Sequence, residues 1–102
     1  IGSRESTPTV AQGLAADSKS VRSRAARALG LIGDTRAIAP LADTLADDDS
    51  HTVRASAAWA LVQIGTERAL EAASEYADDP SPLVESEAET AAEALGVAGA
   101  KA

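Results

Sequence analysis

The chain has 102 residues, enough for one domain with a modest core, and alanine supplies 25 of them, which predicts an all-helical protein. Sixteen acidic residues against nine basic ones give a net charge of −7 at pH 7. Cysteine is absent, which excludes a disulfide framework or a thiolate metal site in this segment and favours the cytoplasm. No run of about 18 apolar residues occurs, so no membrane-spanning helix is predicted.

One short alanine-rich pattern occurs three times, at residues 25–33, 57–65 and 91–99, and each copy ends in glycine. The closing glycines lie 32 and 34 residues apart, a spacing typical of a solenoid built from repeated helix pairs. A broken copy, Ile1-Gly2, predicts that the chain begins inside a repeat of a longer array. The predicted division of the single domain 1–102 is a repeat end at 1–6, repeats at 7–33 and 34–65, and an atypical or capping repeat at 66–102.

Each repeat is expected to hold two antiparallel helices. The first helix of each repeat follows a capping signal, which is Thr7 before Pro8 in the first repeat, Asp34 in the second and Thr66 in the third. The first helix of the second repeat should carry Ile38, Leu41 and Leu45 on one face.

The second helix of each repeat contains the alanine-rich pattern. Val21 and Val53 are predicted to begin its buried stripe in the first two repeats. Gly33 and Gly65 are predicted to end these helices in the left-handed conformation. In the third repeat, Ser81 before Pro82 predicts the start of a longer second helix.

Residues 45–54 read Leu-Ala-Asp-Asp-Asp-Ser-His-Thr-Val-Arg and precede the second alanine-rich copy. In this context they resemble a HEAT repeat and, more narrowly, the short HEAT-like repeats named after the phycobilisome lyases. The resemblance covers essentially the whole chain. It implies an all-α, right-handed solenoid of three two-helix repeats, with about six helices. The many acids and few lysines also resemble a haloarchaeal protein.

In that family, an arginine after valine and an aspartate in the preceding loop form a ladder that connects successive repeats. Asp47 and Asp49 are alternatives to Asp48 as the aspartate of the second loop. Glu85 stands where the third repeat would need its arginine, so the ladder is expected to end there. The candidate ladder residues are Arg22, Arg54, Asp17 and Asp48.

The variable position inside the pattern holds Arg27, Trp59 and Glu93. Helical periodicity places Arg27 and Trp59 nearly opposite the buried stripe, and the resemblance puts the second helices on the concave face. An exposed tryptophan beside an arginine is typical of an interface hot spot, although Trp59 packed across an alanine-rich neighbour is the alternative. The candidate partner-binding residues are Trp59, Arg24, Arg27, Ser56, Gln63, Glu89 and Glu93.

No catalytic residues, metal ligands or cofactor site are predicted, because His51 is the only histidine and the acids at 47–49 lack the alternating spacing of a calcium loop. Residues 37–102 hold three bases and 13 acids, which disfavours nucleic acid. We therefore expect a non-enzymatic scaffold that binds a protein or peptide along the concave face, without membrane contact. The alternatives are part of a bilin (phycocyanobilin) lyase-like enzyme, as the resemblance implies, and a spacer without a groove ligand. Exposed repeat ends around Val10 and Leu14 are expected to permit self-association.

Overall fold

The computed structural model describes the backbone of residues 3–100 and the side chains of residues 3–96. This part of the chain contains six α-helices and three short 3₁₀ helices and no β-strand. The α-helices are α1 (Thr7–Gln12), α2 (Lys19–Ile32), α3 (Ile38–Asp47), α4 (His51–Ile64), α5 (Glu67–Ser74) and α6 (Pro82–Ala100). The predicted all-helical fold with about six helices is thus confirmed.

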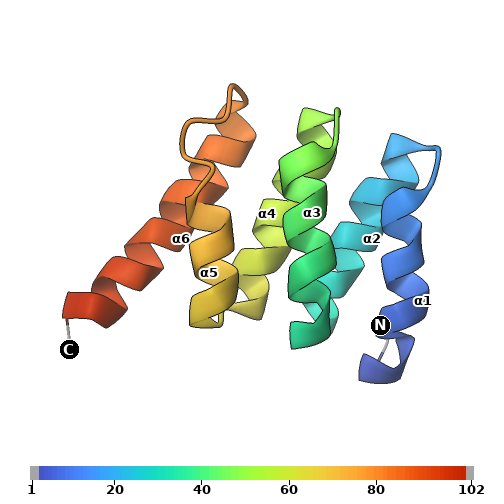
Figure 1. The fold of residues 1–102 in the computed structure, drawn as a ribbon, viewed down its shortest axis with the longest axis horizontal. Helices are drawn as coiled ribbons and strands as arrows, with labels where there is room; N and C mark the ends of the chain where they lie inside the picture. Colours follow the sequence, from blue (N-terminus) through green and yellow to red (C-terminus); the bar gives the residue numbers. More distant parts are fainter. Residues whose placement is uncertain (1–2, 101–102) are drawn as a thin grey trace.

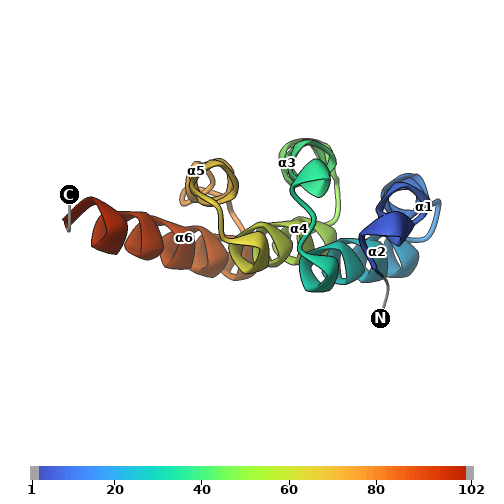
Figure 2. The ribbon, with the colours of Figure 1, turned by 90° about the horizontal axis from the view of Figure 1, so that it is seen from below.

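The six helices form two layers. Helices α1, α3 and α5 lie side by side in one layer, and the longer helices α2, α4 and α6 lie side by side in the other (Figures 1 and 2). Each first-layer helix runs antiparallel to the second-layer helix that follows it (Figure 1). The described molecule measures 40 × 31 × 18 Å, so it is an elongated stack of helix pairs, the architecture of a helical solenoid.

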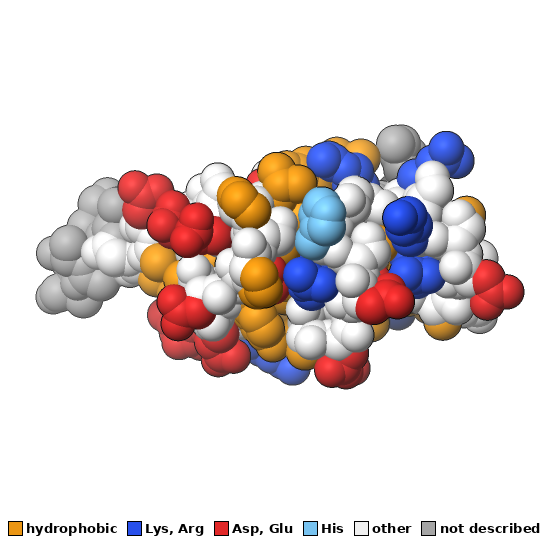
Figure 3. Space-filling view, turned by 90° about the horizontal axis from the view of Figure 1, so that it is seen from above, with side chains coloured by type: hydrophobic (Ala, Val, Ile, Leu, Met, Phe, Trp, Pro, Cys, Tyr) orange, Lys and Arg blue, Asp and Glu red, His pale blue; other side chains and the backbone are white. Residues whose placement is uncertain are grey.

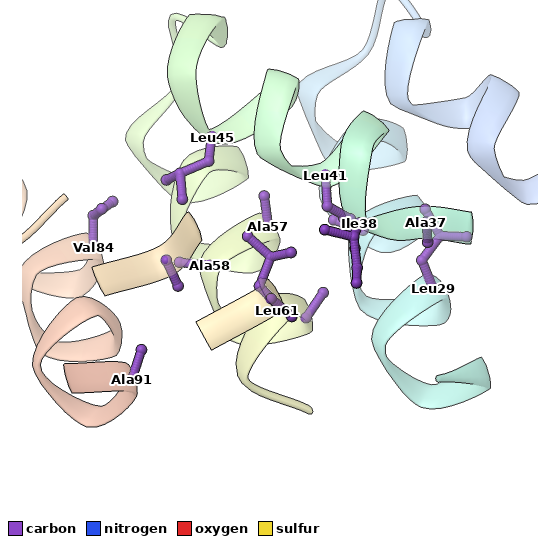
Figure 4. Packing of buried hydrophobic residues seen from close by; sticks show 14 residues of the cluster. Leu29, Ala37, Ile38, Leu41, Leu45, Ala57, Ala58, Leu61, Val84 and Ala91 are labelled. Carbon is purple, nitrogen blue, oxygen red and sulfur yellow. The ribbon is translucent and has the colours of Figure 1, made fainter. Parts of the chain in front are cut away.

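The core lies between the two layers and consists of leucines set among alanines (Figure 4). Leu41 and Leu45 of α3 are fully buried against the second layer, where Leu29 and Leu61 are also fully buried. The remaining fully buried positions include Ala26, Ala57 and Ala58, Ala60 and Ala91, which allow the helices to approach closely.

Local signals fix the helix ends. The hydroxyls of Ser18, Ser50 and Thr66 accept hydrogen bonds from backbone N–H groups in the first turns of α2, α4 and α5. Gly33 and Gly65 follow α2 and α4 with φ of 75° and 72°, the left-handed conformation predicted for them. The predicted cap at Thr66 and the predicted helix ends at Gly33 and Gly65 are therefore confirmed.

Two predictions about the first repeat are wrong, namely that Thr7 caps its first helix and that Val21 is buried. Thr7 does not cap α1: a 3₁₀ helix (Arg4–Ser6) leads directly into it, so Thr7 already lies in the first turn and is buried. Val21 is 44% exposed, whereas Val53 is fully buried. Helix α4 has a second-layer neighbour on both sides, but within the described residues α2 has one on only one side. The same motif therefore buries its valine in one repeat and not in the other.

Candidate interaction surface

The loop of the second repeat is tied to helix α2 by Arg22. Its Nε donates to Oδ2 of Asp48 at 2.8 Å and its Nη2 to Oδ1 of the same carboxylate at 3.2 Å. The remaining nitrogen, Nη1, donates to the backbone carbonyls of Ala16 and Asp17, both at 3.0 Å. The planar guanidinium therefore joins its own loop to the loop of the next repeat.

The same arrangement recurs one repeat later. Nε and Nη2 of Arg54 donate to the two carboxylate oxygens of Asp79 at 3.0 and 3.2 Å, and Nη1 donates to the carbonyl of Asp48 at 3.0 Å. The side chains of Asp48 and Asp79 are 8% and 7% exposed, so both ion pairs are largely shielded from solvent.

The surroundings of these two carboxylates favour the ionised form. The hydrogen bonds from Arg54 and from the N–H of Ser81 hold the pKa of Asp79 below its usual range, although burial opposes them. Burial acts most strongly on Asp48 and would raise its pKa, but the hydrogen bonds from Arg22 and Ser50 outweigh it and the pKa is lowered. Both aspartates are therefore ionised structural groups at neutral pH.

The sequence interpretation identified Asp48 correctly but placed the ladder position of the first loop one residue too late, at Asp17. Asp48 and Asp79 stand two residues before Ser50 and Ser81, and each accepts the N–H of that serine at 2.9 Å. The corresponding position before Ser18 is Ala16. The side chain of Asp17 is exposed, and only its backbone carbonyl takes part. The expected role of the Asp17 carboxylate is therefore not what the structure shows. Asp79 carries the second rung of the ladder instead.

Trp59 of α4 packs against Gly30 of α2 and is half-buried. The Arg27 guanidinium carbon lies 4.9 Å from the centroid of its ring, a cation–π arrangement. The Cζ3 atom of the ring would lie only 2.9 Å from a Cβ placed on Gly30. Trp59 was expected to be either an exposed interface residue or a residue packed across the neighbouring helix. The structure shows both features, since part of the ring packs across Gly30 and part remains open to solvent.

The open part of Trp59 lines a hollow of about 180 Å³ between α4 and α6. Leu83 of α6 is 55% exposed at its wall, and Glu87 lies one turn further along the helix. Burial raises the pKa of Glu87, and the positive charge of Arg27 acts in the opposite direction. The lining residues are Arg27, Thr52, Ala55, Ser56, Trp59, Leu83, Ser86 and Glu87.

A second hollow of about 360 Å³ adjoins the first on the α2 side. It shares Arg27 and Thr52 with the first hollow, so the two form one continuous surface, here called the second-helix face. Its lining residues are Lys19, Ser20, Ser23, Arg24, Arg27 and Thr52. The second-helix face is therefore basic at its α2 end, aromatic in the middle and acidic at Glu87.

The structure brings together only part of the predicted partner-binding set. Arg24, Arg27 and Trp59 line the second-helix face. Ser56 also lines the hollow beside Trp59, but it is 4% exposed and its hydroxyl lies 2.6 Å from that of Ser23, so its side chain is largely enclosed by the packing between α4 and α2. The exposed side chains of Gln63, Glu89 and Glu93 line neither hollow.

Sequence reasoning missed Glu87, Leu83 and Lys19. It aligned the repeats on their closing glycines, but α6 contains extra residues before its glycine. Aligned on the serines before the second helices, Glu87 and Arg24 are each the sixth residue after that serine. That alternative alignment is the signal that would have placed Glu87 on the second-helix face.

Charge is divided along the stack. Figure 3 looks onto the edge that carries the loops between first and second helices. Acidic side chains gather at the end where α5 and α6 lie, and most basic side chains cover the other half (Figure 3). Arg22, Arg36 and Arg54 are held in ion pairs with aspartates. Within the part of the chain that the structure describes, Lys19, Arg24 and Arg27 form none.

Helices in the described part of the chain are too short or too polar to cross a membrane. Among the same residues, no three or more acidic or histidine side chains are grouped so as to hold a metal ion. Comparison with protein families matches residues 3–96 to the model described as HEAT repeats. A comparison with curated proteins finds no match.

Proposed function

The chain belongs to the HEAT repeat family, and from this premise we propose that it is a non-enzymatic scaffold that binds a protein or peptide on its second-helix face. One observation carries the proposal: Trp59 is held under Arg27 beside a hollow, with part of its ring open to solvent. Tryptophan and arginine are the residues most enriched among those that dominate binding energy at protein interfaces. Because Gly30 and Arg27 fix the ring, little side-chain entropy is lost when a partner covers it.

The proposal is tested by photo-crosslinking in the cells that make the protein. A benzophenone amino acid at Gln63, which is exposed on α4 one turn from Trp59, should capture a distinct protein. The same group at Arg68, exposed on α5 in the other layer, should not capture it. The Gln63 adduct should disappear when Trp59→Ala is added. Equal adducts from both positions, or an adduct that survives Trp59→Ala, would contradict binding at this face.

Two alternatives from the sequence are distinguished by the same experiment. A spacer without a groove ligand would give no adduct from either position. A bilin lyase-like role predicts a chromophore change when the folded chain is mixed with phycocyanobilin, independently of any adduct. No arrangement of side chains on the second-helix face favours the bilin lyase-like role, so we prefer the scaffold role.

We also propose that these repeats belong to the short type named after the phycobilisome lyases and that the chain is adapted to high salt. The compact Asp-x-Ser loops before α4 and α6, each closed by an arginine from the preceding repeat, support the first part. The excess of acids, with only Lys19 and Lys101 as lysines, supports the second. A cytoplasmic location accords with the lack of cysteine and is part of the same proposal.

A further inference from the structure

We propose that the partner presents an acidic, apolar segment: its carboxylates contact Lys19, Arg24 and Arg27, and a neighbouring aliphatic side chain enters the hollow beside Trp59. This inference rests on the proposed function, because it uses the same face. It adds the chemistry of the partner and the direction in which the partner lies.

The charge distribution points to carboxylates. The chain has only nine basic residues against 16 acidic ones, and its net charge is −7. Three of them, Lys19, Arg24 and Arg27, line a single hollow of about 360 Å³. The hollow has no acidic lining residue, and no ion pair involves these cations in the described part of the chain. In an acidic protein, unpaired cations gathered at one place attract a negatively charged group most strongly there.

The adjoining hollow points to an apolar side chain. Its volume of about 180 Å³ exceeds the roughly 30 Å³ that one water occupies, so a side chain can enter. Trp59, Leu83 and Ala55 supply apolar walls, and the side chain of Leu83 is 55% exposed to solvent. Covering Leu83 and the open part of the Trp59 ring would remove apolar surface from water.

Glu87 fixes the direction of the segment. It lines the apolar hollow from α6, where burial raises its pKa and the charge of Arg27 on the opposite side acts in the other direction. A carboxylate placed beside Glu87 would be repelled, whereas one placed beside Arg24 would be attracted. The acidic part of the segment must therefore lie over α2 and the aliphatic side chain over α4 and α6.

The same acid disfavours nucleic acid as the occupant. A phosphate backbone that continued from α2 across the second-helix face would meet the carboxylate of Glu87 on α6. Peptide carboxylates can be confined to one end of a short segment, but backbone phosphates cannot.

Trp59 is the only tryptophan in the chain, so its fluorescence reports directly on the hollow. The probe is a synthetic peptide with consecutive glutamates followed by one leucine. Titration at low salt should change the Trp59 emission in a saturable way. Arg24→Glu should weaken binding about tenfold or more, because it replaces attraction by repulsion. Arg68→Glu changes the net charge by the same amount on the other layer and should leave binding unchanged.

Two further peptides test the two halves of the proposal. Replacing the glutamates by lysines should abolish binding, and replacing the leucine by serine should weaken it and reduce the emission change. Helical circular dichroism and the melting temperature of Arg24→Glu should match the parent, which shows that the variant is folded.

Several results would overturn the inference. These are equal weakening by Arg24→Glu and Arg68→Glu, tighter binding of the lysine peptide, or displacement of the acidic peptide by a short DNA duplex at equal concentration. No emission change with the acidic peptide would overturn it as well. If the Gln63 crosslink still forms and still depends on Trp59, the scaffold proposal stands and only the acidic, apolar partner is rejected.

Discussion

Asp79 shows why arginine, and not lysine, holds successive loops together. Its carboxylate accepts two hydrogen bonds from the Arg54 fork and one from the N–H of Ser81, while the third guanidinium nitrogen, Nη1, reaches the carbonyl of Asp48. A lysine ammonium has no planar fork and cannot satisfy both carboxylate oxygens and that carbonyl in this geometry. The pair is 17% and 7% exposed, so solvent cannot replace what a substitution removes.

Arg54→Ala should therefore lower the free energy of unfolding by about 2 kcal/mol, because it leaves the Asp79 carboxylate buried and without its main partner. Urea denaturation followed by circular dichroism measures the change. Arg68→Ala, at an exposed arginine that forms no ion pair among the described residues, should change it by less than about 0.5 kcal/mol. Equal effects of the two substitutions would contradict a structural role for the Arg54–Asp79 pair.

The lowered pKa of Asp79 predicts a pH dependence with a definite sign. A carboxyl group with a folded-state pKa below its unfolded value of about 4 stabilises the fold above that value, and this stabilisation is lost as the pH falls through the folded pKa. Asp79→Asn should thus be markedly less stable than the parent at pH 7, and the difference should shrink steadily below about pH 4. Melting temperatures at pH 7, 5 and 3 test this, with the exposed neighbour Asp78→Asn as control. A difference that grows in acid would have the wrong sign.

At this scale, the sequence predicted residues that match the family motif and missed those whose position depends on how the repeats are aligned. Arg22, Arg54 and Asp48 were identified because they match the arginine after valine and the loop aspartate of the HEAT-like repeats that the chain resembles. The first-loop position was missed because Asp17 lies one residue closer to its arginine than Asp48 does. Alignment on the serines before α2, α4 and α6 puts Ala16, Asp48 and Asp79 at the same position. Glu87 was missed for a related reason, since extra residues in α6 shift its face relative to the closing glycine.

Helices α2 and α4 approach each other closely at Gly30. A Cβ on Gly30 would lie 2.8 Å from the Cα of Ala60 and 2.9 Å from Cζ3 of Trp59, so the two backbones nearly touch there. The hydroxyls of Ser23 and Ser56 meet at 2.6 Å along the same contact. Small residues thus set the distance between these helices, and through it the width of the second-helix face.

Gly30→Ala should destabilise the protein by about 1–3 kcal/mol even though alanine favours helix, because a backbone atom of α4 must move to make room. Gly96→Ala is the matched control. Gly96 also lies inside a helix, α6, but a Cβ there would meet nothing within 4 Å. It should stabilise the protein by about 0.5–1 kcal/mol. Thermal unfolding of both variants measures the contrast, and stabilisation by both would refute the close helix contact.

On the scale of the whole molecule, the fold was predictable because each repeat must bury the same face with the same few residues. The period of the glycine-terminated pattern gave the number of helix pairs, and the apolar spacing gave their inward faces. Edge effects were not predictable in this way. The motif that buries Val53 leaves Val21 44% exposed, because burial at an edge depends on a neighbour and not on the motif itself.

The acidic excess at the α6 end predicts how the whole stack responds to salt. Acids on α6, such as Glu89 and Glu93, lie near one another on an exposed surface, so screening their repulsion should raise the melting temperature between low salt and about 1 M. Glu89→Lys should raise the melting temperature at low salt and reduce its salt dependence. The control Asp43→Lys changes the charge at an exposed position of α3, away from α6, and should have a smaller effect. A melting temperature that falls with salt would show that attractive pairs, and not repulsion, dominate.

The ladder also sets a rule for how this array can grow. Each ion pair of the ladder joins the arginine of one repeat to the aspartate of the next, so an internal repeat needs both a donor arginine and an acceptor aspartate. The first loop offers Ala16 where an acceptor would stand, and α6 offers Glu85 where a donor would stand. A duplicated repeat inserted between α2 and α3 would inherit both partners and continue the ladder. A repeat added beside Ala16 or Glu85 would join without a rung. By this rule, a copy of the middle repeat continues the ladder, whereas a copy of the first or third repeat would interrupt it.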